Sequence, residues 1–308
     1  HLDHLGALSN IPSEATVHLP SLLVYEDMEE RWNKSSTWLS LVPRKYYVKL
    51  EETKPLETDE NNVMAIPLSH SAYPACALLY FGRDETILYT GDFRVESFLN
   101  KDEFTELNEG EDLLSFLNEN TDIRVDSLII EGTNIGSDRL PLSPKEATET
   151  MRRIVTNQRP IIATLHNLDI EYAYTLMKIC AESSLDLYIA STQTTKLLEK
   201  KPQKPVKPIL IEEYVDYLTP LEKVSVADVE ENSLIIVPYR EIIDFLRDIE
   251  QVKKGFLCQA VAIISEPEPE IEEASECTVI ANWLSKIGIQ FYRIRASGHY
   301  YPYQLKTI

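Results

Sequence analysis

The sequence predicts a layered α/β protein with two structural units, and two observations support this prediction. From about residue 143 onward, short apolar runs alternate with stretches of helical character, as in βαβ units around a mainly parallel sheet. Before that point, short apolar strands each end in a polar residue that could take part in chemistry, and layered α/β folds build active sites at such strand ends. With 308 residues, the chain is long enough for two compact units.

The composition is that of a soluble globular protein, with 44% hydrophobic and 26% charged residues. No apolar run approaches the roughly 18 residues that span a bilayer, so no membrane partner is predicted. The formal net charge of −20 argues against a polyanionic partner, because nucleic-acid binders usually carry a basic face. The acidic surplus is concentrated in residues 102–119, 230–231 and 266–273, which are predicted to be solvated faces and loops. Bound cations would add local positive charge that this count omits.

The four cysteines, Cys76, Cys180, Cys258 and Cys277, are scattered without C-x-x-C spacing. Three of them lie in apolar stretches, so buried free thiols are favoured over disulfides. Free thiols indicate a reducing compartment, and the predicted location is the cytoplasm.

The first unit is predicted to consist of strands and turns. Apolar strands are expected at residues 63–67, 77–81, 86–89 and 127–130. Residues 82–85, with the sequence Gly-Arg-Asp-Glu, have the composition of a turn, so the second and third of these strands should form a hairpin.

The second unit is predicted to begin with a helix from Ser143 to about Thr156, because Ser143 is a good N-cap and Pro144 suits the first helical position. Further helices are expected at residues 169–181, 195–200, 241–252 and 271–287. Strands are expected at residues 160–165, 185–190, 209–211, 234–237, 256–264 and 290–294. The Lys- and Pro-rich stretch 200–208 is predicted to be a linker or an exposed loop.

A cluster of metal-binding residue types lies at the start of the chain, where His1, Asp3 and His4 stand close together. Two imidazoles and a carboxylate are poor core material but good ligands for a divalent metal. A tight loop could present His1 to one metal, and Asp3 with His4 to another. His70, directly after a strand, could complete the imidazole set, and Asp92 could give one oxygen to each metal. The alternatives are a surface or capping histidine and an ordinary turn aspartate.

These ligands suit Zn²⁺, with Mn²⁺ as the alternative. Two such ions lower the pKa of a shared water and stabilise the oxygens of an in-line displacement at phosphorus, and Asp3 could orient that water. Near the end of the chain, Ser297 and Gly298 precede His299. Their backbone N–H groups could approach a phosphate, and His299 could act as general acid or phosphate-binding donor. The alternative for His299 is an ordinary loop histidine.

In this order, the motifs resemble those of the β-CASP branch of the metallo-β-lactamase superfamily, whose members act on nucleic acids. The resemblance covers nearly the whole chain. Besides the loop from His1 to His4, it rests on Pro-Leu-Ser-His-Ser at 67–71, Thr-Gly-Asp-Phe-Arg at 90–94, Ile-Ile-Glu-Gly-Thr at 129–133 and Arg-Ala-Ser-Gly-His at 295–299. The Ser-Gly-His form of the last motif is typical of ribonuclease J-type enzymes. Ser265-Glu266-Pro267 is less closely similar to the family's S-x-P turn.

The resemblance implies a partial αββα metallo-β-lactamase sandwich with an inserted Rossmann-like α/β β-CASP domain. Residues 1–143 would form the metallo-β-lactamase domain, residues 144–288 the β-CASP domain, and residues 289–308 the return to the first domain. The acid of the 129–133 motif, Glu131, would hydrogen-bond a ligand histidine.

The resemblance further implies a metal-dependent nuclease that cleaves single-stranded RNA in the cleft between the two domains, by attack of a metal-bridged hydroxide. The implied ligands of its two divalent metals are His1, Asp3, His4, His70 and Asp92. The implied catalytic residues are Asp3, Glu131 and His299. The implied substrate-binding residues are Ser297, Gly298 and His299.

Several alternatives stay open. One is a non-catalytic β-CASP scaffold subunit of an RNA-processing complex, and another is a DNA-acting repair nuclease. A small-molecule hydrolase is disfavoured, because such enzymes lack the α/β insert. The sequence leaves open exonuclease or endonuclease action and a homodimer. One basic cluster could touch RNA, although a solvated linker is favoured; its members are Lys196, Lys200, Lys201, Lys204 and Lys207.

The sequence departs from the family pattern in three places. The leading histidine of the first motif would stand two positions before His1, and the last ligand histidine is expected on a strand after Ile308. The Asn-x-His-Arg that ribonuclease J often carries after the 160–165 strand is also missing, so His166 is left out of the site. The chain is therefore expected to be a fragment that binds metal poorly.

Overall fold

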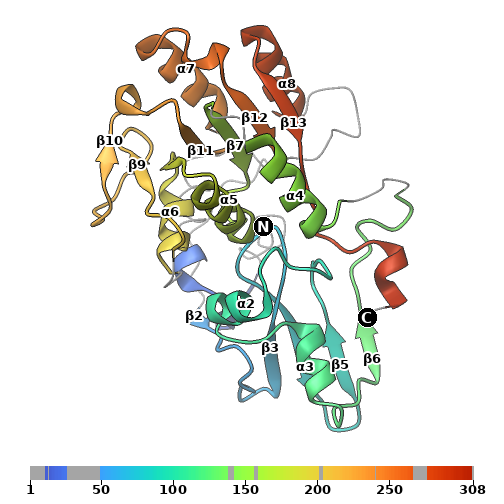
Figure 1. Cartoon of the computed structure of the whole chain (residues 1–308). Helices are drawn as coiled ribbons and strands as arrows, with labels where there is room; N and C mark the ends of the chain where they lie inside the picture. Colours follow the sequence, from blue (N-terminus) through green and yellow to red (C-terminus); the bar gives the residue numbers. More distant parts are fainter. Residues whose placement is uncertain are drawn as a thin grey trace.

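The computed structural model of the protein describes residues 11–12, 14–25, 49–137, 142–155, 159–200, 204–239, 241–265 and 276–306, without the side chains of 276–278. The predicted ligands His1, Asp3 and His4 lie outside the described residues, and so does the acidic run at 266–273. The described part of the chain forms two units, each built on its own sheet (Figure 1).

The first unit contains a four-stranded sheet in the order β3-β4-β5-β6. Its strands are β3 (Val63–Leu68), β4 (Ala75–Phe81), β5 (Thr86–Tyr89) and β6 (Ser127–Ile129). β4 pairs antiparallel with both β3 and β5, whereas β6 pairs parallel with β5. Consequently β3, β5 and β6 run in the same direction and end at the same edge of the sheet. The four predicted strands and the hairpin are confirmed, with small differences at strand ends.

Residues 102–119 are predicted to be solvated faces and loops. The loop part is wrong, because the helices α2 (Lys101–Asn108) and α3 (Leu113–Glu119) occupy most of this segment, whereas the solvated faces are confirmed at Asp102, Glu106 and Glu119, which are exposed. α2 begins at a capping box, in which the Asn100 side chain accepts from the backbone of the third helical residue. Each helix buries two apolar residues at helical spacing, although most of its residues are polar or acidic. These pairs are Phe104 and Leu107 in α2, and Leu113 and Phe116 in α3. The pair in α3 packs on the buried face of the four-stranded sheet.

The second unit is a seven-stranded sheet in the order β10-β9-β8-β11-β7-β12-β13, in which every pair is parallel. Its strands are β7 (Ile161–Leu165), β8 (Asp186–Ile189), β9 (Ile209–Ile211), β10 (Lys223–Val224), β11 (Ser233–Pro238), β12 (Val261–Ile264) and β13 (Gln290–Arg293). The predicted alternation of strands and helices around a mainly parallel sheet is confirmed.

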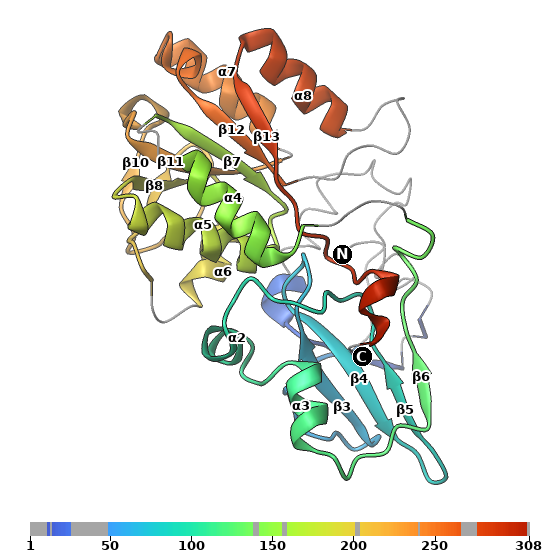
Figure 2. The ribbon, with the colours of Figure 1, turned by 45° about the vertical axis from the view of Figure 1, so that its right-hand side comes forward.

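Helices cover both faces of this sheet (Figures 1 and 2). The helices on one face are α4 (Pro144–Val155), α5 (Ile170–Glu182) and α6 (Thr192–Glu199), and those on the other are α7 (Ile242–Val252) and α8 (Glu276–Ile287). The central strands are therefore apolar on both sides. In β7, Ile161 and Ala163 join the core under α5, while Ile162 joins the core under α7.

The second unit differs from the prediction in several places. α6 begins at Thr192 rather than at residue 195, and the two-residue strand β10 is not predicted. Residues 256–264 are predicted as one strand, but a 3₁₀ turn, η4 (Phe256–Cys258), precedes β12. Gly255 begins this turn with φ of 88°, and a short apolar run does not distinguish such a turn from a strand. The return to the first unit is predicted at residue 289, but β13 still pairs with β12, so the chain returns only after Arg293.

A parallel pair of strands, β1 (Thr16–Leu19) and β2 (Lys49–Glu52), is not predicted from the sequence, because strands of this length carry too little periodicity. Free thiols are confirmed for Cys76, Cys180 and Cys258, although Cys258 is exposed rather than buried. The side chain of Cys277 lies outside the described residues.

None of the helices in the described ranges is both long enough and apolar enough to cross a membrane.

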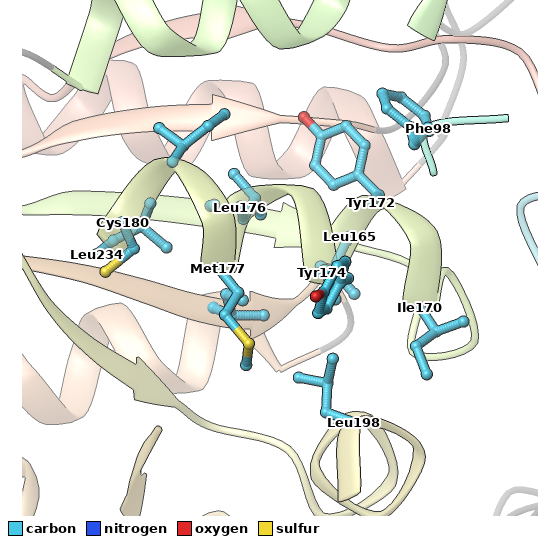
Figure 3. Close-up of a cluster of buried hydrophobic side chains, with 14 of the residues drawn as sticks. Phe98, Leu165, Ile170, Tyr172, Tyr174, Leu176, Met177, Cys180, Leu198 and Leu234 are labelled. Atoms are coloured by element: carbon cyan, nitrogen blue, oxygen red, sulfur yellow. The ribbon is translucent and has the colours of Figure 1, made fainter. Parts of the chain in front are cut away.

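The two units share a core, which fixes the position of one relative to the other. Phe98 and Phe104 of the first unit join the cluster formed by α5 and the large sheet. Figure 3 shows Phe98 beside Tyr172 of α5, with ring centroids 5.4 Å apart in an edge-to-face contact. The Tyr172 hydroxyl donates to the carbonyl of Ile294, where the chain returns from β13. Side chains of both units can therefore contribute to one rigid site.

Candidate metal centre

Residues that follow four strands converge at the boundary between the two units. His70, Asp92 and Glu131 come soon after β3, β5 and β6, at the edge where these strands end together. His299 comes after β13 of the other sheet. The ligand atoms of His70, Asp92 and His299 all lie within 4.8 Å of one another. The structure thus brings together three predicted site residues that are far apart in the sequence.

His70 is buried, and a backbone contact fixes its ring. Its Nδ1 lies 2.6 Å from the carbonyl oxygen of Gly298, so Nδ1 carries a proton and donates it there. The other nitrogen, Nε2, then keeps its lone pair, as is common for histidines that bind metals. Burial lowers the pKa of His70 well below its ordinary value, which keeps the imidazole neutral near pH 7.

Gly298 packs directly against His70. A Cβ at Gly298 would come within 3.0 Å of the His70 ring and would clash still more severely with the Ser71 hydroxyl. The glycine of the Ser-Gly-His motif therefore has a packing role that spacing alone does not reveal. The hydroxyl of Ser297 is occupied within the loop, where it accepts from the His299 backbone N–H at 3.1 Å. The substrate-binding role of Ser297 and Gly298 stays a prediction.

Glu131 is paired with His299. Its Oε2 lies 2.7 Å from Nδ1 of His299, and its Oε1 accepts from the backbone N–H of Phe93 at 2.9 Å. Burial by itself would raise the pKa of Glu131, but the hydrogen bonds from His299 and Phe93 outweigh it and lower the pKa below its usual value. The ionised carboxylate orients the imidazole and leaves Nε2 of His299 for a metal or a substrate.

Sequence reasoning missed two residues and one role. The Asn134 side-chain amide donates to Ser297 Oγ and to the carbonyls of His299 and Tyr300, which holds the loop in place. The Tyr300 hydroxyl donates to the Glu131 carbonyl at 2.6 Å. Their proximity to Glu131 and His299 in the sequence was the only available signal. The missed role is that of His299, which is predicted to be a general acid or a phosphate-binding donor but also stands among the potential metal ligands.

A cavity of about 250 Å³ opens beside the ligand group. Its lining includes His70, Gly91 and Asp92, together with Tyr73 of the first unit and Leu168 from the loop before α5. The rest of the lining comes from residues 19–25 and from the first unit, so the cavity belongs mainly to the first unit, with Leu168 closing one side, and it offers room for a bound group next to the potential ligands.

The predicted basic cluster is only partly a linker. Lys196 lies within α6, and Lys200 caps its end. The Nζ of Lys200 lies 5.9 Å from the ring centroid of Tyr73, within the range of a cation–π contact. Lys201 lies outside the described residues, and the two remaining lysines precede β9.

The donor set fits a divalent metal. Two imidazoles and one carboxylate make three protein ligands, which is the number found in catalytic zinc sites. The remaining coordination positions are then open to water or substrate. Neutral His70 has the protonation state that a ligand needs. Because His1, Asp3 and His4 lie outside the described residues, a second metal at this position stays a prediction.

Comparison with known proteins informs the fold alone. No family model matches the chain, and no curated protein matches it either. Among solved structures, the chain is similar to a protein of unknown function from Enterococcus faecalis V583, with a TM-score of 0.66 and 18% sequence identity. The match covers 95% of this chain and 66% of that one, so this chain spans about two thirds of its neighbour's length. The two proteins therefore share an α/β fold.

Proposed function

We propose that this chain carries the active site of a metal-dependent phosphodiesterase of the β-CASP type, with single-stranded RNA as substrate. The observation that carries the proposal is the convergence of His70, Asp92 and His299 to within 4.8 Å at the boundary between the units. Their motifs stand in the order typical of β-CASP nucleases. In this proposal, the four-stranded sheet belongs to a metallo-β-lactamase sandwich, and the seven-stranded sheet is the β-CASP insert.

His70, Asp92 and His299 would hold the cation, and their donor atoms suit Zn²⁺ or Mn²⁺. A bound divalent metal supplies Lewis-acid stabilisation of the charge on phosphate oxygens and acidifies water. The chain contributes the fixed direction of the ligands. His70 is held by the Gly298 carbonyl, and Asp92 stands at the end of a strand in a packed sheet.

His299, with its ring held by Glu131, would deliver a proton to the leaving oxygen. A histidine near the scissile phosphate can hold a proton for the leaving oxygen, a role that typically contributes a factor of about 10² to 10⁴ in rate. The Glu131 carboxylate accepts from Nδ1 of His299 at 2.7 Å and so fixes the direction of the ring, with Nε2 facing the site. Because one Nε2 cannot bind a metal and carry a proton at the same time, His299 would serve one role in any given state.

The cavity supports a substrate strand beside the potential ligands. It borders His70 and Asp92, and its wall includes the ring of Tyr73, over which the ammonium of Lys200 lies. Lys200 itself lines a neighbouring cavity that shares Tyr73 with this one, so its ammonium is suited to a phosphate farther along the same strand.

The net charge of −20 favours a second candidate, a non-catalytic β-CASP subunit that scaffolds an RNA-processing complex. An acidic surface repels a polyanionic substrate but does not hinder assembly with other proteins. The paired Glu131 and His299 favour the catalytic candidate, because a scaffold has no need of this buried contact.

A phosphodiesterase assay separates the candidates. Short single-stranded RNA and DNA of the same sequence, labelled at one end, are incubated with the full-length protein and Zn²⁺ or Mn²⁺. We expect metal-dependent cleavage of RNA that Asp92→Asn abolishes and that Asp84→Asn, an exposed change in the β4–β5 turn, leaves intact. Preferential cleavage of DNA would replace RNA by DNA as the substrate. No cleavage of either with any metal would refute the enzyme and leave the scaffold.

A further inference from the structure

Two buried carboxylates stand at the start of α5, in the contact between the two units. Asp169 is the N-cap of the helix and accepts from the backbone N–H of Tyr172 at 3.1 Å. Glu171, in the first turn, is only 4% exposed. A buried carboxylate is costly unless it is paired or accepts hydrogen bonds, so the partners of these two side chains indicate what they hold in place.

Glu171 reaches from the second unit to the strand end that carries His70. Its Oε2 accepts from the hydroxyl of Ser69 at 2.8 Å, from the hydroxyl of Ser97 at 2.9 Å and from the backbone N–H of Phe98 at 3.2 Å. Ser69 directly precedes His70 in the chain. One carboxylate oxygen therefore holds the residue next to a potential metal ligand.

Arg94 connects the same cluster to the strand end that carries Asp92. Its backbone N–H donates to the Ser69 carbonyl at 2.8 Å. Its guanidinium is 4% exposed and lies 3.6 Å from the carboxylate of Asp169. Ser69 is thus held on two sides, by its hydroxyl to Glu171 and by its carbonyl to Arg94. The two segments that carry His70 and Asp92 meet in one buried network.

The simplest alternative is that this network only joins the two units. Apolar contacts already do so, since Phe98 packs on Tyr172 and both belong to the shared core. Buried ionic groups seldom add stability beyond what apolar residues of the same size would give. Glu171 contacts Ser69, which is the neighbour of the potential ligand His70. This contact is more simply explained if it serves to fix the direction of His70.

We propose that Glu171 is a positioning residue, which acts through Ser69 to hold His70 in the direction that metal binding requires. The inference rests on the proposed function, because it assumes that His70 binds a metal. It makes the seven-stranded unit part of the metal centre: α5 supplies no ligand, but its first turn sets the direction of one.

The test compares three variants of the chain. Glu171→Gln keeps the size of the side chain and removes its charge, and Ser69→Ala removes one hydroxyl. Glu103→Gln is the matched control. Glu103 is a partly buried acid that also pairs with α5, through Lys178 at 3.0 Å. Co²⁺ is the probe, because its visible absorption reports the geometry of its ligands as well as binding.

We expect Glu171→Gln to weaken Co²⁺ affinity by about 10-fold, the low end of the range for groups that bond a metal ligand directly, because Glu171 acts one residue away through Ser69, and to shift the visible bands. Ser69→Ala should act in the same direction, and the double variant should lose little more, because both changes break the same contact. Glu103→Gln should leave affinity and spectrum unchanged. If Glu171→Gln fails to fold, Ser69→Ala decides alone.

The outcomes separate the two proposals. A full-length wild-type protein that binds neither Co²⁺ nor Zn²⁺ would overturn the proposed function and this inference with it. A wild-type chain that binds Co²⁺ with the same affinity and spectrum as Glu171→Gln and Ser69→Ala would overturn the positioning role alone. Equal loss of thermal stability in Glu171→Gln and Glu103→Gln with unchanged spectra would likewise reduce Glu171 to a structural contact.

Discussion

Nδ1 of His299 and Oε2 of Glu131 lie 2.7 Å apart, although 168 residues and an entire seven-stranded unit separate them in the chain. Glu131 comes from the four-stranded unit, and His299 arrives on the segment that returns from β13. The contact forms only when both units are folded and in place. It therefore links the chemistry of the proposed site to the packing between the units.

Glu131→Gln should lower the rate of phosphodiester cleavage by about 10- to 100-fold with little change in KM. The amide can still accept from Phe93, but its NH₂ group would face the Nδ1–H of His299, so two donors would meet. Steady-state kinetics on RNA measure the effect. An unchanged kcat in a folded variant would remove Glu131 from the mechanism.

His299→Ala should reduce cleavage by a factor of about 10² to 10⁴ if its ring transfers a proton. Calorimetric Zn²⁺ titration of the same variant assigns the role. Affinity within threefold of wild type would identify a proton donor, whereas a much larger loss would identify a ligand. Wild-type kinetics and affinity together would contradict both roles.

Zn²⁺ should raise the melting temperature of the full-length protein, because a ligand that binds only the folded state stabilises it. At 100 times the dissociation constant, this effect amounts to about 2.7 kcal/mol. A chelator should reverse it, and Asp92→Asn should abolish it, as followed by thermal denaturation. Asp84→Asn, exposed in the β4–β5 turn, is the control and should keep the shift. A full shift in Asp92→Asn would show that Zn²⁺ binds elsewhere.

Gly298→Ala should destabilise the protein by about 1–3 kcal/mol, because the new methyl group has no room beside His70 and Ser71. Zn²⁺ affinity should fall as the loop moves away. Gly132→Ala is a nearby control, since its Cβ would meet only a flexible end of Ile135 at 3.4 Å. Urea denaturation and metal titration measure both effects. Equal stability of the two variants would show that the loop adapts freely.

Leu246→Ala should lower the free energy of unfolding by about 2–5 kcal/mol, because Leu246 is fully buried between α7 and the large sheet. Val252→Ala, at the end of the same helix, should cost about 0.5 kcal/mol or less, because Val252 is 56% exposed. Equal losses in urea denaturation would contradict the assignment of this core.

Local patterns predict most of the second unit, because a parallel sheet covered on both sides requires continuous apolar strands separated by capped helices. The helix at Ser143 is an example: its hydroxyl accepts from Glu146 N, as the N-cap prediction requires. The helices α2 and α3 were missed because their acidic residues dominate the composition, while two apolar residues in each fix the fold.

The sequence by itself determined the α/β class, the strand ends that carry His70, Asp92 and Glu131, and the histidine of the Ser-Gly-His motif. These depend on local periodicity and on residue type, which are readable along the chain. Only the tertiary structure decided that Glu131 meets His299, that Gly298 packs on His70, and that α5 of the second unit reaches Ser69. Such contacts join distant residues, and their geometry is set by how the two units pack together.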